Sequence, residues 1–113
     1  MKSLDIIIPT HNELDSLNEL ISRIENIVLS IKKDRAVNVE LIIVDDSTDE
    51  TIKHLEKYAE EKQWITVIRL TRKFGQVNAI VAGLNYSKAD AVIVMDADLQ
   101  DPPEVIPEMI DAH

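Results

Sequence analysis

Four short runs of β-branched and aliphatic residues, set apart by longer stretches with helical spacing, constrain the fold of this chain more than any other feature. The runs cover residues 4–8, 39–44, 66–70 and 91–95. Each is almost continuously apolar, which is typical of parallel strands that are buried on both faces of a sheet. They therefore predict four strands of one parallel sheet.

The stretches between these runs carry apolar residues at intervals of three and four, the spacing of an amphipathic helix. The apolar stripes are Leu14, Leu17, Leu20, Ile21, Ile24, Ile27, Val28 and Ile31, then Ile52, Leu55 and Ala59, then Val77, Ile80, Val81 and Leu84. Residues 47–50 and 101–104 fit the capping box that begins many helices, and Pro102 suits a first helical turn. Regular alternation of strand and helix predicts an α/β fold, a Rossmann-like parallel sheet with helices on both faces.

Length and charge limit the functions open to the chain. Its 113 residues form one compact domain, and a formal net charge of -9 at pH 7 argues against binding to nucleic acid or an anionic lipid surface. The absence of cysteine excludes disulfides, thiolate metal sites and a cysteine nucleophile. No apolar run approaches the roughly 20 residues that cross a bilayer, and no signal peptide precedes the first run. We therefore expect no transmembrane segment in this chain.

Unusual polar residues follow each of the four predicted strands, at residues 9–13, 45–46, 72–76 and 96–100. Doubly wound folds bind their ligands at the carboxyl ends of the strands, so we expect these segments to form one site. A dinucleotide site would need a glycine-rich turn after the first strand. The only glycines are Gly75 and Gly83, so dinucleotide binding is not expected.

Asp96 and Asp98 form a D-x-D pair directly after the last apolar run. In an extended backbone this spacing points both carboxylates to one side. Such oxygens suit Mg²⁺ or Mn²⁺, which proteins commonly hold with one or two carboxylates and the phosphates of a substrate. A diphosphate alone would be repelled by about 4 kcal/mol per pair of unit charges roughly 4 Å apart, at an effective dielectric constant of about 20. We therefore predict that a divalent ion bridges the two.

A second acidic pair, Asp45 and Asp46, follows the second run. At this place in α/β folds, carboxylates accept hydrogen bonds from the base or ribose of a nucleoside. The alternative is a polar loop that leads into the next helix. Asp49 is interpreted as an acid that the helix dipole favours in a first turn, and Glu13 fits either a site or a helix start.

The remaining polar and aromatic residues have simpler explanations. Arg72 and Lys73 can meet a phosphate, although a solvated loop is the commoner explanation for such a pair. Asp101 and Glu104 favour helix capping over function. Residues expected to lie at the surface, or in the case of the tryptophan to cover the core, are His11, His54, His113 and Trp64.

Four segments, in order along the chain, resemble successive motifs of the GT-A fold family 2 glycosyltransferases. They read IIIPTHNE at 6–13, IIVDDSTDET at 42–51, RKFGQVNAIVAGL at 72–84 and VMDADLQDPPE at 94–104. The last segment looks most like the branch that includes dolichyl-phosphate mannose synthase and bacterial polyprenyl-phosphate glycosyltransferases. The resemblance implies that residues 1–113 are the nucleotide-sugar-binding portion of a GT-A domain.

The resemblance also implies roles for particular residues. Asp45 would contact the base, and Asp96 would lie beside the ribose, the diphosphate and the metal. Mg²⁺ or Mn²⁺ would be held by Asp98 and Gln100. The family implies an inverting transfer from a nucleoside-diphosphate sugar, in this branch usually to a polyprenyl phosphate at the cytoplasmic side of the membrane. Residues implied to line the nucleotide pocket are Pro9, Thr10 and Glu13.

Two features depart from the family pattern. The acidic loop lacks the glycine of the common form DDGS, and the chain ends at His113, before the strands that supply the acceptor site and any catalytic base. The acceptor site and the catalytic base are therefore not assigned to residues of this chain, and the domain is expected to be truncated. With strands in the expected order 3-2-1-4, the fourth strand would be an open edge, and exposed edges invite pairing. We therefore predict self-association or marginal stability.

Two other functions share the predicted α/β pattern. A receiver-like signalling domain also binds Mg²⁺ in an acidic cluster, and one of its aspartates is phosphorylated. A non-catalytic scaffold would use the same acids only as helix caps and solvated loops. Metal-dependent nucleotide binding would separate a glycosyltransferase from both.

Overall fold

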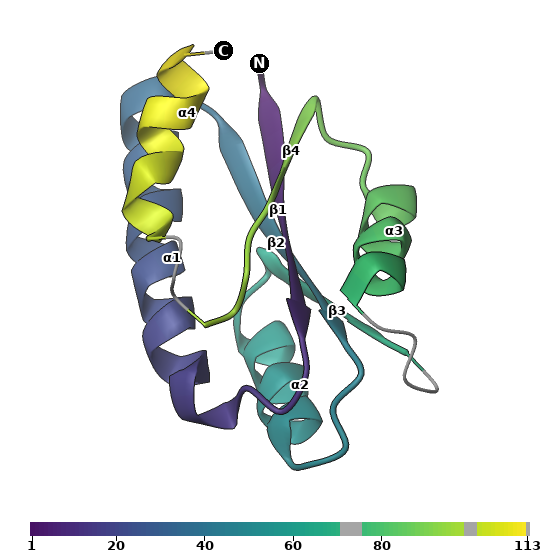
Figure 1. Ribbon diagram of the computed structural model, residues 1–113. Coiled ribbons are helices and arrows are strands. Elements are labelled where there is room, and N and C mark those ends of the chain that lie inside the picture. Colours follow the sequence, from purple (N-terminus) through teal and green to yellow (C-terminus); the bar gives the residue numbers. More distant parts are fainter. Residues whose placement is uncertain (71–75, 99–101, 113) are drawn as a thin grey trace.

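A computed structural model describes residues 1–70, 76–98 and 102–112, along which strands and helices alternate (Figure 1). The strands are β1 (Ser3–Thr10), β2 (Asn38–Asp45), β3 (Ile65–Arg69) and β4 (Ala91–Val94). The helices are α1 (Leu14–Arg35), α2 (Thr51–Glu61), α3 (Gln76–Tyr86) and α4 (Ile106–Ala112), with a 3-10 turn, η1 (Pro103–Val105), before α4. The predicted alternation is confirmed.

All four strands form one parallel sheet in the order β3-β2-β1-β4, as predicted. β1 lies in the interior, paired with β2 from Ser3 opposite Asn38 to Thr10 opposite Asp45. Its other neighbour is β4, in a register that places Ile7 opposite Val94. The carboxyl end of β1 therefore lies between the loops that follow β2 and β4.

Helices cover both faces of the sheet, because apolar side chains of successive strand residues point to opposite sides. Leu4, Ile6 and Ile8 of β1 belong to the core cluster under α1, α2 and α4, to which Trp64 also packs as predicted. Ile7 belongs to the opposite cluster, under α3 (Figure 1). The long stripe predicted for the first helix is buried on the former side, since Leu17, Leu20, Ile21, Ile24, Ile27, Val28 and Ile31 all face the core.

The capping box predicted at residues 47–50 does not form. α2 begins at Thr51 after Glu50, and no side chain caps it at that residue. Ser47 is engaged by Asp45 instead, and the carboxylate of Asp49 accepts the Thr51 backbone N–H at 2.9 Å. The residue that precedes η1 is Pro102, without a side-chain cap, and Asp101 lies outside the described residues.

Glu104, predicted as a cap, forms an ion pair with Arg23 of α1. This pair ties the start of the C-terminal segment to the long helix, and Ile106 is fully buried beside it. Within the described part of the chain, none of the helices combines the length and apolar character that a membrane span requires.

Candidate functional site

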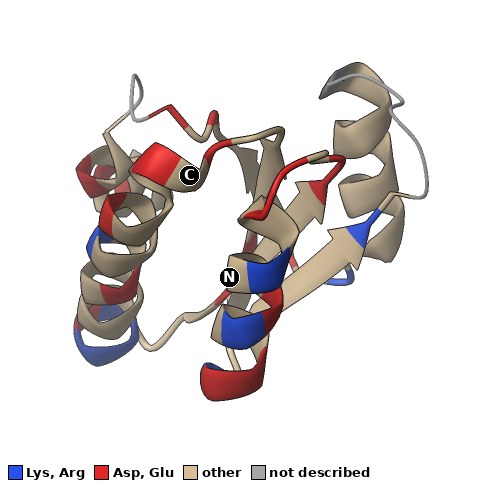
Figure 2. Ribbon diagram, turned by 90° about the horizontal axis from the view of Figure 1, so that it is seen from below, with Lys and Arg blue, Asp and Glu red and all other residues tan. Residues whose placement is uncertain are grey.

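The acidic segments predicted to form a site lie at the same edge of the sheet. Asp45 ends β2, directly opposite Thr10 at the end of β1. On the other side of β1, the Met95 N–H donates to the carbonyl of Ile7 at 3.0 Å, which places residues 96–98 just beyond the same edge. Figure 2 views the molecule from this side and shows acidic residues in the loops that follow the strands. Both acidic loops therefore lie at the carboxyl edge of the sheet, and their grouping into one site stays a prediction.

The carboxylate of Asp45 is buried and fully engaged by neighbouring residues. It is 1 % exposed, and its Oδ1 accepts hydrogen bonds from Thr10 Oγ1 and Ser47 Oγ, both at 2.6 Å. Its Oδ2 accepts the Ser47 backbone N–H at 3.1 Å. Asp45 therefore fixes the loop that follows it, and its predicted contact with a nucleoside base stays a prediction.

His11 does more than occupy the surface, which was its expected place. Its Nδ1 lies 2.9 Å from Oδ1 of Asp46, and the two side chains are 40 % and 8 % exposed. His11 donates this hydrogen bond to Asp46 when Nδ1 carries the proton. The pair adds a second link between the loops after β1 and β2, one residue beyond the link between Thr10 and Asp45.

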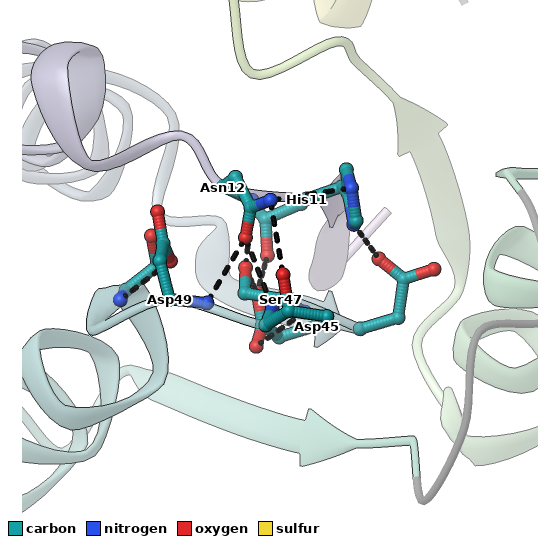
Figure 3. A network of polar contacts seen from close by, with 9 residues as sticks. His11, Asn12, Asp45, Ser47 and Asp49 are labelled. Carbon is teal, nitrogen blue, oxygen red and sulfur yellow. Dashed lines mark hydrogen bonds and ion pairs between the residues drawn. The ribbon is translucent and has the colours of Figure 1, made fainter.

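Asn12 is a site residue that the sequence did not single out (Figure 3). Its side-chain oxygen accepts the backbone N–H groups of Thr48 at 2.9 Å and Asp49 at 3.2 Å. Its own N–H donates to Ser47 Oγ at 2.8 Å. Asn12 has a φ of 54°, a left-handed conformation that asparagine adopts more readily than most residues. An asparagine directly after a strand was the one local signal for it.

The other residues predicted for the nucleotide pocket flank this network. Pro9 is half-buried on β1, opposite Val44 of β2. Glu13 precedes α1, and its carbonyl oxygen accepts the Ser16 N–H at 3.2 Å. Arg69 ends β3 in register with Asp45, and it places a cation at this edge that the sequence interpretation missed. Arg72 and Lys73 lie outside the described residues.

The metal-side segment has a different backbone from the one predicted. β4 ends at Val94, and residues 97 and 98 form a turn, so the argument from an extended strand is wrong. Ala97 is nevertheless buried, whereas Asp96 is half-buried and Asp98 is exposed. The Ala97 carbonyl accepts a hydrogen bond from Ser16 Oγ at 3.2 Å, which anchors the turn to α1.

Two carboxylates on one turn suit an ion that shares its coordination with phosphate oxygens, rather than one enclosed by protein ligands. Residues 1–70, 76–98 and 102–112 contain no group of three or more His, Cys, Asp or Glu that could hold a metal ion by themselves. Gln100, the third predicted ligand, lies outside the described residues. The metal assignment therefore rests on Asp96 and Asp98.

A parallel sheet whose acidic loops gather at the carboxyl edge defines an α/β ligand-binding domain of the nucleotide-binding class. Residues 5–113 match the glycosyl transferase family 2, and because the match covers nearly the whole chain, the protein belongs to this family. Membership favours the glycosyltransferase interpretation over the receiver-like and scaffold alternatives.

Two relatives carry names that specify lipid-linked acceptors. The chain is 38 % identical over 109 residues to a dolichol-phosphate mannosyltransferase of Pyrococcus furiosus, which covers 96 % of this chain and 29 % of the relative. It is 40 % identical over 111 residues to an undecaprenyl-phosphate 4-deoxy-4-formamido-L-arabinose transferase of Edwardsiella ictaluri, at 96 % and 33 % coverage. The chain thus spans about a third of the length of these relatives.

A solved structure shares the fold. A mannosyltransferase from Pyrobaculum calidifontis, in complex with GDP-Man and Mn²⁺, superposes with a TM-score of 0.70 at 25 % identity. The match covers 88 % of this chain and 32 % of that one. The predicted fold class, the nucleotide-sugar-binding part of a GT-A glycosyltransferase, agrees with this likeness.

Proposed function

We propose that this chain binds a nucleoside-diphosphate sugar together with Mg²⁺ or Mn²⁺, as the donor-binding portion of an inverting glycosyltransferase. The observation that carries the proposal is the meeting of two acidic loops, one after β2 and one after β4, on either side of the end of β1. The solved relative that binds GDP-Man and Mn²⁺ supports it.

The two loops bind different parts of the donor complex. On the side of β2, Pro9, Thr10, Asp45 and Asp46 form the floor against which the nucleoside lies, with Glu13 at the entrance to α1. On the side of β4, Asp96, Asp98 and Gln100 hold the divalent ion. This division puts the diphosphate over the end of β1, between the two acidic loops.

A divalent ion at Asp96 and Asp98 offsets the repulsion between these carboxylates and a diphosphate, and it stabilises the charge that develops on the leaving group. The carboxylates themselves orient the ion. Asp98 is exposed, whereas Asp96 is half-buried, so we assign Asp98 the direct contact with the ion and assign Asp96 a place between ion and ribose.

The acceptor is argued from the relatives. Both are named for transfer to a polyprenyl phosphate, dolichol phosphate in one and undecaprenyl phosphate in the other. We propose an acceptor of this class, with the reaction at the cytoplasmic face of a membrane. A full-length enzyme that glycosylates a soluble acceptor and leaves polyprenyl phosphate untouched would contradict this part of the proposal.

The donor-binding proposal predicts metal-dependent affinity for nucleoside diphosphates. We expect Mn²⁺ to strengthen the binding of GDP or UDP by about tenfold or more, measured by calorimetry, because the ion reverses the sign of an interaction worth several kcal/mol. Asp98→Ala should abolish this enhancement, and metal-free binding should become no weaker, because one carboxylate that repels the diphosphate is removed.

Asp34→Ala is the matched control, because it removes an exposed aspartate from α1 without touching the carboxyl edge. It should retain the full enhancement. Equal affinities of the unmodified chain with and without Mn²⁺ would refute metal-assisted donor binding, and the receiver-like alternative would then be tested by labelling with acetyl phosphate.

A further inference from the structure

The segment that joins β1 to α1 contacts both acidic loops at once. We call residues 11–16 the connector, residues 45–49 the nucleoside loop and residues 96–98 the metal loop. The connector lies between the other two because β1, from which it emerges, is flanked by β2 on one side and β4 on the other. Whatever sets the conformation of the connector therefore sets the distance between the two loops.

On the nucleoside side, one residue makes most of the contacts. Asn12 accepts two successive backbone N–H groups, those of Thr48 and Asp49. Its amide nitrogen donates to Thr48 Oγ1 at 3.3 Å, and its backbone N–H donates to Ser47 Oγ. Ser47 in turn donates to the buried Asp45. Asn12, a single residue with a left-handed backbone, thus fixes the course of a loop 36 residues away in sequence.

This contact has a particular importance in the present chain, whose acidic loop lacks the glycine of the common form. Without a glycine, the loop has no residue that adopts unusual backbone angles at little cost. Asn12 on the neighbouring connector has the left-handed backbone instead. Its side-chain oxygen holds the loop by accepting hydrogen bonds from the consecutive N–H groups of Thr48 and Asp49.

On the metal side, the connector makes a hydrogen bond to the backbone. Ser16 Oγ lies 3.2 Å from the carbonyl oxygen of Ala97, the residue between the two aspartates of the D-x-D pair, and 3.3 Å from that of Glu13, and its one proton is shared between these two acceptors. The side chain of Ala97 is 3 % exposed, so the turn is held both by burial and by this bond. The directions of the flanking Asp96 and Asp98 side chains depend on the orientation of this peptide.

We infer that Asn12 and Ser16 are positioning residues that act on separate halves of the site, Asn12 on the nucleoside and Ser16 on the metal ion. The inference rests on the proposed donor binding and adds that different residues position the nucleoside half and the metal half of the site. Neither residue needs to touch the ligand, because each acts through the loop that it holds.

Because Asn12 and Ser16 act on different parts of the site, their substitutions should change different quantities when GDP or UDP is titrated with and without Mn²⁺. Asn12→Gly removes the side-chain amide but tolerates the left-handed backbone, so the loop loses the hydrogen bonds of the amide to Thr48 and Asp49 without added strain, and the bond from the backbone N–H to Ser47 remains. A loop that is competent about a tenth of the time binds about tenfold more weakly. We expect that loss for GDP and UDP both with and without Mn²⁺, so the enhancement by Mn²⁺ stays unchanged.

Ser16→Ala should do the reverse. Metal-free affinity stays at the level of the unmodified chain, and the enhancement by Mn²⁺ falls by about tenfold or more, the usual effect of removing an outer contact that orients metal ligands. Ser16→Thr keeps the hydroxyl and should restore the enhancement. If Ser16 had only a structural role, Ser16→Ala would lower the metal-free affinity and the enhancement by Mn²⁺ together. Ser16→Thr would then not restore the enhancement alone.

Ser22→Ala and Asn26→Ala, both at exposed positions of α1, are the matched controls and should bind as the unmodified chain does. Ser47→Ala breaks the nucleoside-side bridge from the opposite loop and serves as a second test if Asn12→Gly does not fold. Its expected signature is that of Asn12→Gly.

The outcomes separate the inference from the proposal beneath it. An unmodified chain that binds neither nucleotide contradicts donor binding itself, and the first titration shows this. If the unmodified chain binds with Mn²⁺ enhancement but Asn12→Gly and Ser16→Ala match it, or lose both quantities equally, the assignment of the two residues is overturned while donor binding stands.

Discussion

Gly83 is the residue at which the packing of α3 on the sheet leaves least room. A Cβ at this position would lie 2.7 Å from Cγ2 of Ile7 and 3.3 Å from Cγ2 of Val44. The near atom belongs to a β-branched side chain that is fully buried, so it cannot swing away. The helix therefore approaches β1 and β2 more closely than any side chain would allow.

Gly83→Ala should destabilise the fold. Overpacking a core of this kind costs about 1–3 kcal/mol, whereas the better helix propensity of alanine recovers only about 0.5–1 kcal/mol. Urea denaturation should show a lower free energy of unfolding than for the unmodified chain. Asn85→Ala, at an exposed position of the same helix, gains propensity without a clash and should not be destabilised. A Gly83→Ala chain as stable as the original would disprove the close approach.

At the same scale, the sequence indicated some site residues and missed others for a physical reason. Asp45 and Asp98 were predicted because acids directly after apolar runs are a local pattern. Asn12 and Ser16 were missed because their roles depend on partners 36 and 81 residues away. No spacing along the chain encodes such a contact until the strand order is known.

The elements themselves were largely predictable, because the hydrophobic pattern sets them. Every predicted run became a strand within two residues at its ends. Helix starts were less predictable, since residues 47–50 match a capping box but Ser47 has a better partner in the buried carboxylate of Asp45. A tertiary contact overrode a local signal there, as it does in many loops.

The attachment of α4 to α1 depends on two carboxylates and should weaken in acid. Hydrogen bonds from Arg23 lower the pKa of Glu104, and those from Arg35 lower the pKa of Asp111. A carboxylate whose pKa is lower in the folded state stabilises that state above its unfolded pKa, and the contribution is lost as pH falls through the folded value. Glu104→Gln should therefore lower the unfolding temperature at pH 7.

The difference between Glu104→Gln and the unmodified chain should shrink and then vanish as the pH falls through the lowered pKa of Glu104 in the folded state, because the glutamate becomes neutral there. Glu104 and Asp111 are both exposed, so the effect is small and screened by salt. Glu56→Gln on α2 is the control, and it should melt like the unmodified chain at neutral and at acidic pH. A Glu104→Gln deficit that persists undiminished in acid would contradict a role for this ion pair.

For the molecule as a whole, the order β3-β2-β1-β4 agreed with the expectation drawn from the family resemblance. That agreement follows from right-handed crossovers, which leave few arrangements for four parallel strands. Composition alone would not have distinguished them. Among the described residues β4 pairs with β1 alone, so its outer edge is open.

The open edge of β4 and the uncharged helix α3 both expose apolar side chains, and we expect these to favour association of two copies. α3 contains no charged residue and exposes Val77, Val81 and Leu84, and β4 exposes Val94. A chain with a net charge of -9 repels its own copies except where charge is absent. We expect sedimentation velocity to show dimers or larger species at high protein concentration.

Val81→Lys should shift that equilibrium toward the monomer, because it places a strongly hydrated charge in the apolar contact. Leu29→Lys is the matched control, since Leu29 is 64 % exposed on α1, at the opposite face. It should associate as the unmodified chain does. A monomeric unmodified chain across the accessible concentration range would rule out this contact.

The connector closes two loops of very different length. Its bond to the nucleoside loop spans 36 residues, and its bond to the metal loop spans 81. For a flexible chain, closing the longer loop costs roughly 0.7 kcal/mol more in configurational entropy. We therefore expect heat or denaturant to act unevenly on the two loops, so that the hydrogen bond to residues 96–98 opens before the hydrogen bonds to residues 45–49.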